Sequence, residues 1–181
     1  MNTIILYKSK YGSTKRYAQW LADELQCGIA EAGTLSVSQL DAYDCIIFGG
    51  GIFASGVKSI KWFKKTYSRL HGKQVAVFAV GASPANEKDI EECRTRSLSP
   101  ELEGVPFFYL RGAWNEPDMT FFDRKLCGLL KSEIAKKPQG EREGWETALL
   151  EVYSEGNNGV FDWASKEQLE PLFKWHAGLT S

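Results

Sequence analysis

The stretch from Thr3 to Thr14 reads Thr-Ile-Ile-Leu-Tyr-Lys-Ser-Lys-Tyr-Gly-Ser-Thr, an apolar run followed at once by a turn rich in hydroxyl groups. The apolar run predicts a buried strand, and the amphipathic segment after Thr14 predicts a helix. A turn between a strand and a helix offers an anion free backbone N–H groups, hydroxyl donors and the positive end of the helix dipole. We therefore interpret this turn as a phosphate-binding loop formed by Ser9, Lys10, Tyr11, Gly12, Ser13 and Thr14. The alternative is an ordinary turn with Thr14 as the helix N-cap.

Apolar runs and helix-like segments alternate along the rest of the chain. Continuous apolar runs are typical of parallel strands that are covered on both faces. The predicted strands cover residues 3–7, 29–32, 45–48, 75–80 and 105–110, and the predicted helices cover about 14–27, 60–70, 86–103, 122–134 and 166–176. Parallel neighbours need crossover helices, so the pattern predicts an α/β three-layer sandwich with helices on both faces of a parallel sheet. In such folds ligands bind beyond the carboxyl ends of the strands.

A glycine-rich segment, residues 49–56, follows the third predicted strand and is expected to form a tight loop. Glycine lets backbone groups approach the edge of a flat ring closely, while a neighbouring apolar side chain covers the ring. The match to GxGxxA is not taken as a dinucleotide fingerprint, because residues 67–73, about twenty positions on, contain no carboxylate to hold a ribose. The ring-contacting residues expected here are Gly50, Gly51, Ile52, Phe53 and Ala54. Phe53 also has an alternative place in the core.

A third loop, residues 81–86, follows the fourth predicted strand and supplies small residues and an amide for the other side of a ring. Its expected contacts are Gly81, Ala82, Ser83 and Asn86, and the alternative is a simple turn into a helix capped by Ser83 or Asn86. Trp114 follows a later strand end, where an indole stacks on the ring, lines the approach of a substrate, or covers the segment that comes next. Together the three loops describe one phosphate, a linker and a planar ring, which fits FMN better than a dinucleotide.

The first loop and the two ring-contacting loops resemble those of flavodoxins. Their phosphate loop usually has Thr or Ser at its ends and Gly in the same place, as in Ser9-x-Tyr11-Gly12-Ser13-Thr14 here, and residues 49–53 and 80–83 are similar to their ring loops. The resemblance implies FMN as the cofactor and a flavodoxin-like five-stranded parallel sheet in the order 2-1-3-4-5. Tyr11 departs from the threonine that is common in flavodoxins, which removes one phosphate donor.

A narrower resemblance lies further along the chain. Arg111-Gly112, Asp118-Met119 and Phe121-Phe122-Asp123-Arg124, followed by a leucine-rich helix, are similar to the flavodoxin-domain group that includes the oxygen-independent protoporphyrinogen oxidases. The likeness to flavodoxin domains covers about residues 1–137 and the last helix. Residues 138–158 match nothing that we can name.

Length and composition set further bounds. We expect residues 1–181 to form a single domain with an elaborated segment at about 113–160. The formal net charge of -1 argues against general nucleic-acid binding, and no apolar stretch approaches the roughly 20 residues of a membrane span. The N-terminus shows no secretion signal, so we expect a cytoplasmic location. The four cysteines form no CxxC pair, and no spacing predicts a catalytic residue or a metal site.

These features favour an FMN-dependent oxidoreductase that passes electrons between a reductant and a small aromatic or quinone-type acceptor. One alternative is a flavodoxin-type electron carrier to a protein partner, although such carriers are often strongly acidic and this chain is nearly neutral. Another is a flavodoxin-like binding module without a cofactor. The expected partner is a small-molecule or protein redox partner, and the oligomeric state stays open, with a homodimer among the options.

Overall fold

The central sheet has the predicted strand order. A computed structural model of the chain describes residues 1–53, 56–154 and 159–179. Five parallel strands lie in the order β2-β1-β3-β5-β6. Their bounds are Gly28–Glu31 for β2, Thr3–Lys8 for β1, Cys45–Phe53 for β3, Gln74–Gly81 for β5 and Phe107–Arg111 for β6. Counted along the chain, these parallel strands follow the order 2-1-3-4-5, so the predicted flavodoxin-like fold class is confirmed.

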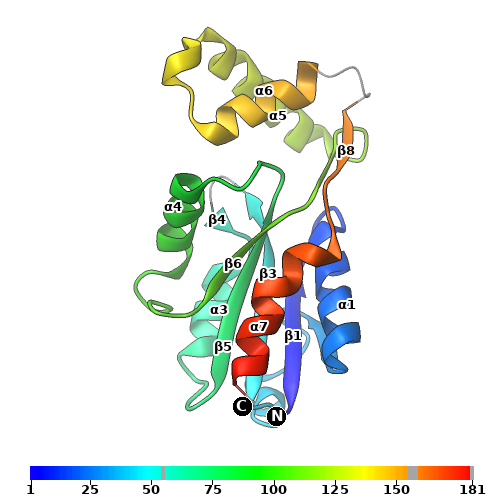
Figure 1. The fold of residues 1–181 in the computed structure, drawn as a ribbon, viewed down its shortest axis with the longest axis vertical. Coiled ribbons are helices and arrows are strands. Elements are labelled where there is room, and N and C mark those ends of the chain that lie inside the picture. The colour runs from blue at the N-terminus through cyan, green and yellow to red at the C-terminus, as the bar shows by residue number, and fades with distance from the viewer. Residues whose placement is uncertain (54–55, 155–158, 180–181) are drawn as a thin grey trace.

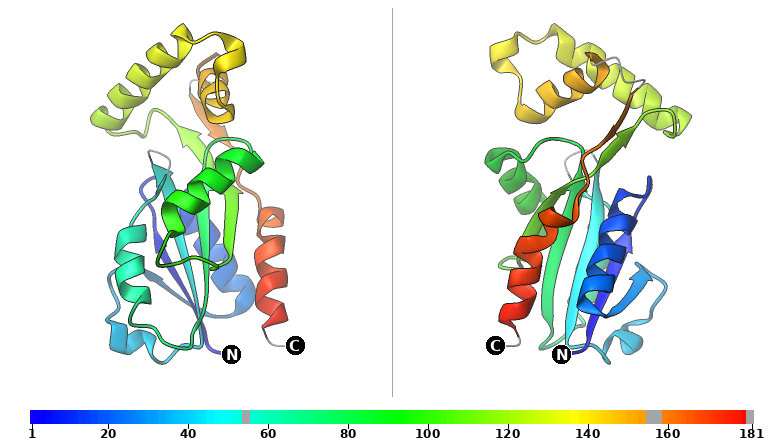
Figure 2. Two further views of the ribbon diagram at one scale, coloured as in Figure 1. Left: turned by 90° about the vertical axis from the view of Figure 1, so that its left-hand side faces the viewer. Right: turned by 45° about the vertical axis from the view of Figure 1, so that its right-hand side comes forward.

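Helices cover both faces of the sheet, as Figures 1 and 2 show. One face carries α1 (Ser13–Leu25), the short helix η2 (Lys166–Leu169) and α7 (Glu170–Gly178), and the other carries α2 (Val37–Leu40), α3 (Ile60–Tyr67) and α4 (Glu87–Leu98). Successive side chains of a strand point to opposite faces, and β1 uses both. Ile5 packs in the same cluster as Leu21 of α1, whereas Ile4 and Leu6 pack in the cluster of Phe63 of α3. This double burial explains the continuous apolar runs of the sequence.

The predicted end of the third strand is wrong. We expected a loop from residue 49, but β3 continues through the glycines to Phe53 and then pairs antiparallel with β4 (Gly56–Val57). Gly49, Gly50 and Gly51 lie beside Phe78, Ala79 and Val80 of β5 in the parallel ladder. The glycines are needed inside this strand because neighbouring side chains fill the space where a Cβ would lie, as at Gly49, where that position is 1.9 Å from Phe78 Cζ.

The elaborated segment forms a helical layer beyond the carboxyl ends of the strands (Figure 1). After β6 the chain forms β7 (Ala113–Asn115), α5 (Phe121–Lys136), η1 (Gln139–Glu141) and α6 (Gly144–Ser154), and it returns through β8 (Val160–Asp162), which pairs antiparallel with β7. We call α5 and α6 the helical cap. The two helices pack on each other, and Ile134, Ala148 and Val152 are buried.

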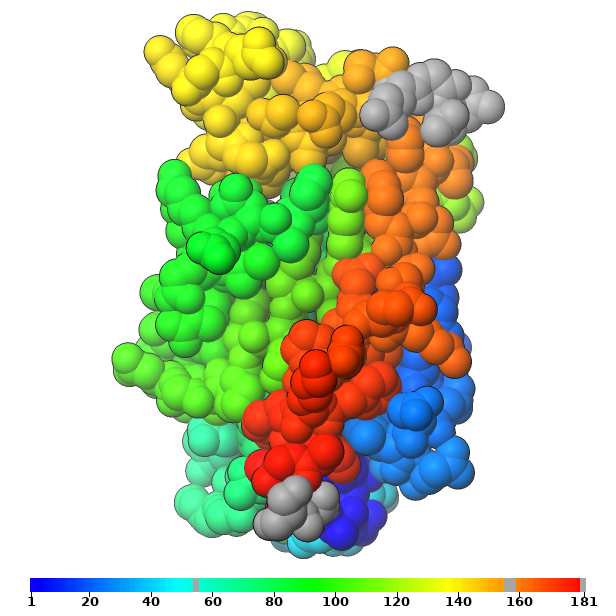
Figure 3. Space-filling view, viewed as in Figure 1, coloured from blue at the N-terminus to red at the C-terminus, as the bar shows by residue number. Residues whose placement is uncertain are grey.

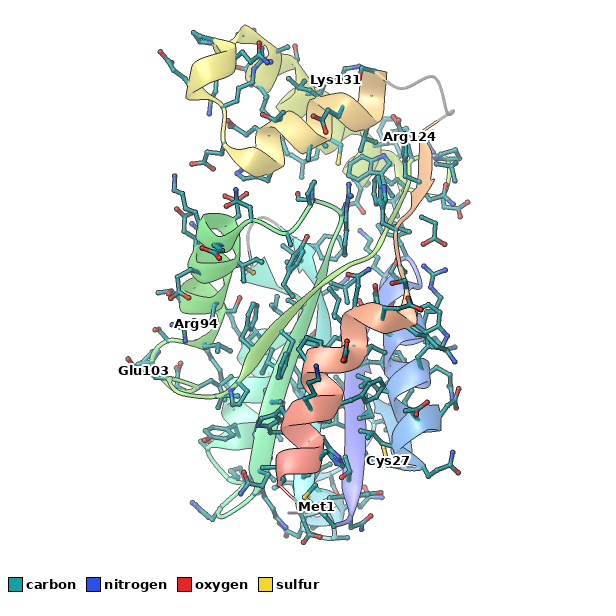
Figure 4. All side chains as sticks on the ribbon, in the orientation of Figure 1. Met1, Cys27, Arg94, Glu103, Arg124 and Lys131 are labelled. Carbon is teal, nitrogen blue, oxygen red and sulfur yellow. The ribbon has the colours of Figure 1, made fainter. Side chains whose placement is uncertain are left out.

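Helix α5 turns most of its apolar side chains to solvent. The predicted amphipathic helix is present, yet Phe122 is 80%, Leu126 55% and Leu129 58% exposed, and Ile134 is the buried member of the stripe. The side that faces α6 instead carries Lys131, whose Nζ lies 4.3 Å from the centre of the Tyr153 ring; Figure 4 labels this lysine in the cap. Neither α5 nor any other helix in the described parts of the chain is long and apolar enough to cross a membrane.

His176 makes the stability of the fold depend on pH. It lies on α7, and its Nε2 is 2.9 Å from Oγ1 of the buried Thr3 on β1. Burial and the nearby N-terminal ammonium lower the pKa of His176 from its ordinary value. The unfolded chain therefore binds this proton more readily than the folded chain, and the free energy of unfolding falls as the pH drops from about 7 towards 5.

We expect His176→Gln to lose this part of the pH dependence. The measurement is urea unfolding at several pH values between about 5 and 7.5 for the wild type and the variant. His71→Gln is the matched control, because His71 is exposed near the end of α3. Curves of unfolding free energy against pH that run parallel for the wild type and His176→Gln would show that His176 does not couple folding to protonation.

Candidate functional site

The predicted phosphate loop connects β1 to α1. Gly12 is the N-cap of α1 and has a φ of 98°, a left-handed conformation that favours glycine. The Gly12 N–H donates to Ser9 Oγ at 3.1 Å, and the Arg16 N–H donates to the Gly12 carbonyl at 2.9 Å. The alternative with Thr14 as the N-cap is wrong, because Thr14 is the second residue of the helix. The turn is thus shaped by Gly12 and closed by the Ser9 hydroxyl.

The N-terminus of α1 presents a set of donors suited to a phosphate. Within the described chain no side chain caps this helix. The N–H groups of Ser13, Thr14 and Lys15 lie in the first turn, where a helix has no acceptor of its own. A Cβ built at Gly51 would lie 3.5 Å from Thr14 Oγ1, and one built at Gly112 would lie 3.3 Å from Ser13 Oγ. The loop hydroxyls therefore lie beside the ends of β3 and β6.

The two predicted ring-contacting loops meet at the ends of β3 and β5. A Cβ built at Gly81 would lie 3.2 Å from Ile52 Cδ1, so the second and third loops are in contact there. Asn86 has the role that the alternative interpretation gave it, since its Oδ1 accepts a hydrogen bond from the Asp89 N–H at 3.2 Å and caps α4. Ala54, which we also expected in this site, lies outside the described residues.

Phe53 lies at the end of β3 and is 39% exposed, so its alternative place in the core is wrong. Two lysines face its ring: Lys10 Nζ lies 5.6 Å and Lys58 Nζ 5.1 Å from the ring centre. A half-exposed aromatic ring beside the phosphate loop is available to stack on a flat ligand or to contact its edge. Phe53 thus lies at the carboxyl end of β3, and its contact with a flat ring stays a prediction.

Gly50 has a packing role of its own. A Cβ at this position would lie 2.5 Å from Val57 Cγ1 and 2.7 Å from the Lys58 carbonyl oxygen. Both atoms belong to the segment that folds back along β3 after Phe53. The absence of a side chain at Gly50 is therefore explained by the β3–β4 hairpin, whether or not a ligand approaches its backbone.

Trp114 belongs to the elaborated segment. It lies on β7 opposite Phe161 of β8, and its ring meets the Tyr153 ring of α6 edge-on, with ring centres 6.0 Å apart. Its Nε1 is buried and has no hydrogen-bond partner within the described residues. These contacts correspond to the covering role that we gave as the alternative to stacking on a ring.

The helical cap is attached on both sides of the three loops. At the phosphate loop, Asp123 of α5 accepts hydrogen bonds from Lys10 Nζ and from the Tyr11 hydroxyl. On α4, which follows the third loop, Asp89 Oδ2 accepts a hydrogen bond from the Trp145 N–H at the start of α6 at 3.1 Å. Figure 3 shows an indentation between the cap and α4 on one face of the molecule. The cap thus spans the edge of the sheet at which the three loops gather.

The contact with Asp123 gives Tyr11 a structural role in this chain. The Tyr11 hydroxyl donates to Asp123 and accepts from the Thr120 N–H at 3.3 Å, so it reaches the first turn of α5. The Lys10 ammonium and the Tyr11 hydroxyl lower the pKa of the Asp123 carboxyl, and the hydrogen bond to Asp123 raises the pKa of Lys10. Two of the predicted site residues are therefore bound to the cap.

Sequence reasoning missed the residues that hold the third loop. Tyr109 OH donates to the Ser83 carbonyl at 2.6 Å, and Arg111 Nε donates to the Ala82 carbonyl at 3.0 Å. Desolvation raises the pKa of Tyr109, which keeps its hydroxyl protonated as a donor. The signal that could have identified them is their spacing, since residues two apart on one strand point to the same face.

Sequence comparisons match the chain to a family model and to one curated protein. Residues 4–140 match the sequence model of a family described as flavodoxin domain. The uncharacterized protein MJ0298 of Methanocaldococcus jannaschii is 35% identical over 86 residues, which are 46% of this chain and 57% of that protein. The chain thus spans less than two thirds of the length of this curated relative.

The solved structures that the chain matches include two flavoproteins. A WrbA-like flavodoxin from Agrobacterium tumefaciens is 21% identical with a TM-score of 0.47, and the match covers 68% of this chain and 88% of that one. A flavoprotein in complex with FMN from Lactobacillus acidophilus is 19% identical with a TM-score of 0.44, covering 61% of this chain and 91% of that one.

Proposed function

Because the chain belongs to the flavodoxin-domain family, we propose that it is an FMN-dependent oxidoreductase that passes electrons from a reductant to a small aromatic or quinone-type acceptor. The observation that carries this proposal is the helical cap, which is attached both to the phosphate loop and to α4. A cap over the edge where the loops meet favours a small substrate over a broad protein surface as the acceptor. We also propose that residues 1–181 act as one unit, with the segment at about 113–160 serving as this cap.

The residues at the edge of the sheet fit FMN. The N–H groups of Ser13, Thr14 and Lys15 and the hydroxyl of Ser9 would hold the oxygens of its phosphate, since a helix N-terminus favours a negative group. A single phosphate-binding loop suits a mononucleotide such as FMN better than a dinucleotide. Ile52 and Phe53 would border one side of the ring, and the backbone of residues 81–83 the other.

FMN supplies the electron transfer when it is bound, and the protein contributes binding, orientation and charge. Lys10 and Lys58, which flank Phe53, place positive charge near the rim of the ring site. These two ammonium groups would favour a ligand that carries negative charge at this rim. The ordered third loop, held by Tyr109 and Arg111, fixes the backbone groups that would meet the ring edge.

An absorbance spectrum of the purified protein and mass analysis of the ligand released by denaturation test this proposal. We expect flavin bands and FMN. Recovery of FAD would overturn the assignment of one phosphate, and a colourless protein that fails to quench the fluorescence of added FMN would overturn both flavin functions in favour of a binding module.

Turnover separates the enzyme from the electron carrier. We expect the reduced protein to reduce a free quinone at a rate that changes little with salt, because a neutral substrate is not steered by charge. Reduction of a protein acceptor that slows steeply with salt, without turnover of free quinones, would favour the carrier.

A further inference from the structure

We propose that Asp123 is an internal competitor of the phosphate group of FMN. In this view, which rests on the proposed function, the carboxylate ties the first turn of α5 to the phosphate loop through Lys10 and Tyr11. A phosphate that enters the loop takes over Lys10 and loosens this tie. Asp123 is then a positioning residue that couples the helical cap to occupation of the phosphate site.

The contacts place an anion at the anion-binding loop. Lys10 Nζ and the Tyr11 hydroxyl both bind Asp123 Oδ2, although 113 and 112 residues separate the partners in sequence. The Thr120 N–H adds a hydrogen bond to the Tyr11 hydroxyl, so the loop meets α5 at its N-cap residue. Lys10 and Asp123 keep only 28% and 25% of their side chains exposed, so this ion pair is partly shielded from water.

Competition follows from the charges. The carboxylate carries one negative charge, whereas a phosphate monoester carries close to two at neutral pH and is the stronger partner for a lysine. Lys10 belongs to the same turn as the α1 N-terminus, and its ammonium lies 5.2 Å from the centre of the Tyr11 ring, within reach of the loop. Phosphate binding and the Asp123 contact therefore disfavour each other. By linkage, the factor by which bound phosphate weakens the Asp123 contact equals the factor by which the contact weakens phosphate binding. A substitution that removes the contact therefore strengthens phosphate binding.

Three variants test the proposal through affinity. We expect Asp123→Asn to tighten FMN binding by about fivefold or more, and Tyr11→Phe, which leaves all charges in place, to tighten it by about twofold, as expected for modest coupling energies. Binding of riboflavin, which lacks the phosphate, should stay unchanged in both. Glu133→Gln is the matched control, because it removes the other carboxylate of α5, which is 70% exposed and pairs with Lys136 on the same helix. Its FMN affinity should equal that of the wild type.

Hydrogen exchange tests the tie without any cofactor. In the ligand-free protein, we expect the amides of residues 120–124 to exchange roughly threefold faster or more in Asp123→Asn than in the wild type, because local opening becomes easier. Addition of FMN should speed the same amides in the wild type and leave those of Asp123→Asn unchanged. Equal exchange rates in the two ligand-free proteins would show that the Asp123 contact does not hold the first turn of α5 in place. This conclusion would not depend on which ligand the protein binds.

The affinity results have two contrary outcomes. Weaker FMN binding by Asp123→Asn would show that the contact prepares the loop for phosphate and would overturn competition. Tighter binding by Asp123→Asn together with no change in Tyr11→Phe would show simple repulsion through space, which would also overturn it. A wild type that binds neither FMN nor riboflavin would instead contradict the proposed function, and the ligand-free exchange comparison would still decide whether the tie exists.

Discussion

Ser13→Asp is expected to weaken FMN binding by about a hundredfold, equivalent to about 2.7 kcal/mol. Ser13 is the first residue of α1, and its hydroxyl lies beside Gly112 at the end of β6. A carboxylate here would remove a hydroxyl donor and place a negative charge against the phosphate, and each charge-assisted hydrogen bond contributes roughly 1.5–3 kcal/mol. The same carboxylate is favourable for the helix, because acidic residues in the first turn complement its dipole.

The prediction therefore separates binding from folding. Titration of FMN into the ligand-free protein by fluorescence quenching measures the affinity, and urea unfolding without FMN measures the stability, which we expect to be equal or slightly higher in the variant. Ser13→Asn is the control with nearly the same shape and no charge, and riboflavin is the control ligand. If Ser13→Asp bound FMN as tightly as Ser13→Asn, the phosphate would lie away from the α1 N-terminus and the proposed site would be wrong.

The layers of this fold could be predicted from short-range patterns, whereas the strand order was expected from the resemblance to flavodoxins. Strands buried on both faces need apolar residues at consecutive positions, and β1, β3 and β5 show such runs. A helix that packs on a sheet needs the spacing of three and four seen in Ala18, Leu21, Ala22 and Leu25 of α1. Because each requirement concerns neighbours a few residues apart, one sequence suffices to reveal it.

The attachment of the cap could not be predicted in the same way. Asp123 and Lys10 are 113 residues apart, and nothing in the local pattern of either stretch identifies the other as its partner. The exposed face of α5 shows the same limit, since the stripe of Phe122, Leu126 and Leu129 predicts a helix whether or not another element covers it. Which face of the cap packs depends on tertiary contacts such as those between Lys131 and Tyr153.

The glycine run shows how one pattern serves two purposes. We attributed residues 49–51 to close approach of a ligand, and Gly51 does lie beside Thr14 of the phosphate loop. Gly49 and Gly50, in contrast, make room for Phe78 and for Val57. Both explanations require a position without a side chain, so composition alone could not assign them; the difference lies in which atoms occupy the neighbouring space.

Gly49→Ala is expected to lower the free energy of unfolding by about 3 kcal/mol or more, a large share of the stability of an ordinary domain. The added Cβ would lie 1.9 Å from Cζ and 2.4 Å from both Cε atoms of Phe78, and a ring held in a central strand cannot move aside without disturbing the core. Urea unfolding measures the effect. Gly28→Ala on β2 is the matched control, because its nearest neighbour would be the Tyr43 hydroxyl at 3.7 Å and the change should stay within about 0.5 kcal/mol.

A second variant separates the clash from any other role of Gly49. Phe78→Leu alone should destabilise the protein by leaving a cavity, yet in the Gly49→Ala background it frees the space that the new methyl group needs. We therefore expect the double variant to be more stable than the sum of the two single effects allows, with an interaction energy of about 1–3 kcal/mol. Strictly additive losses would mean that Phe78 does not fix this glycine. FMN affinity of the double variant, measured below its unfolding transition, should match the wild type, because Gly49 is required by the core and the phosphate is held elsewhere, at the N-terminus of α1.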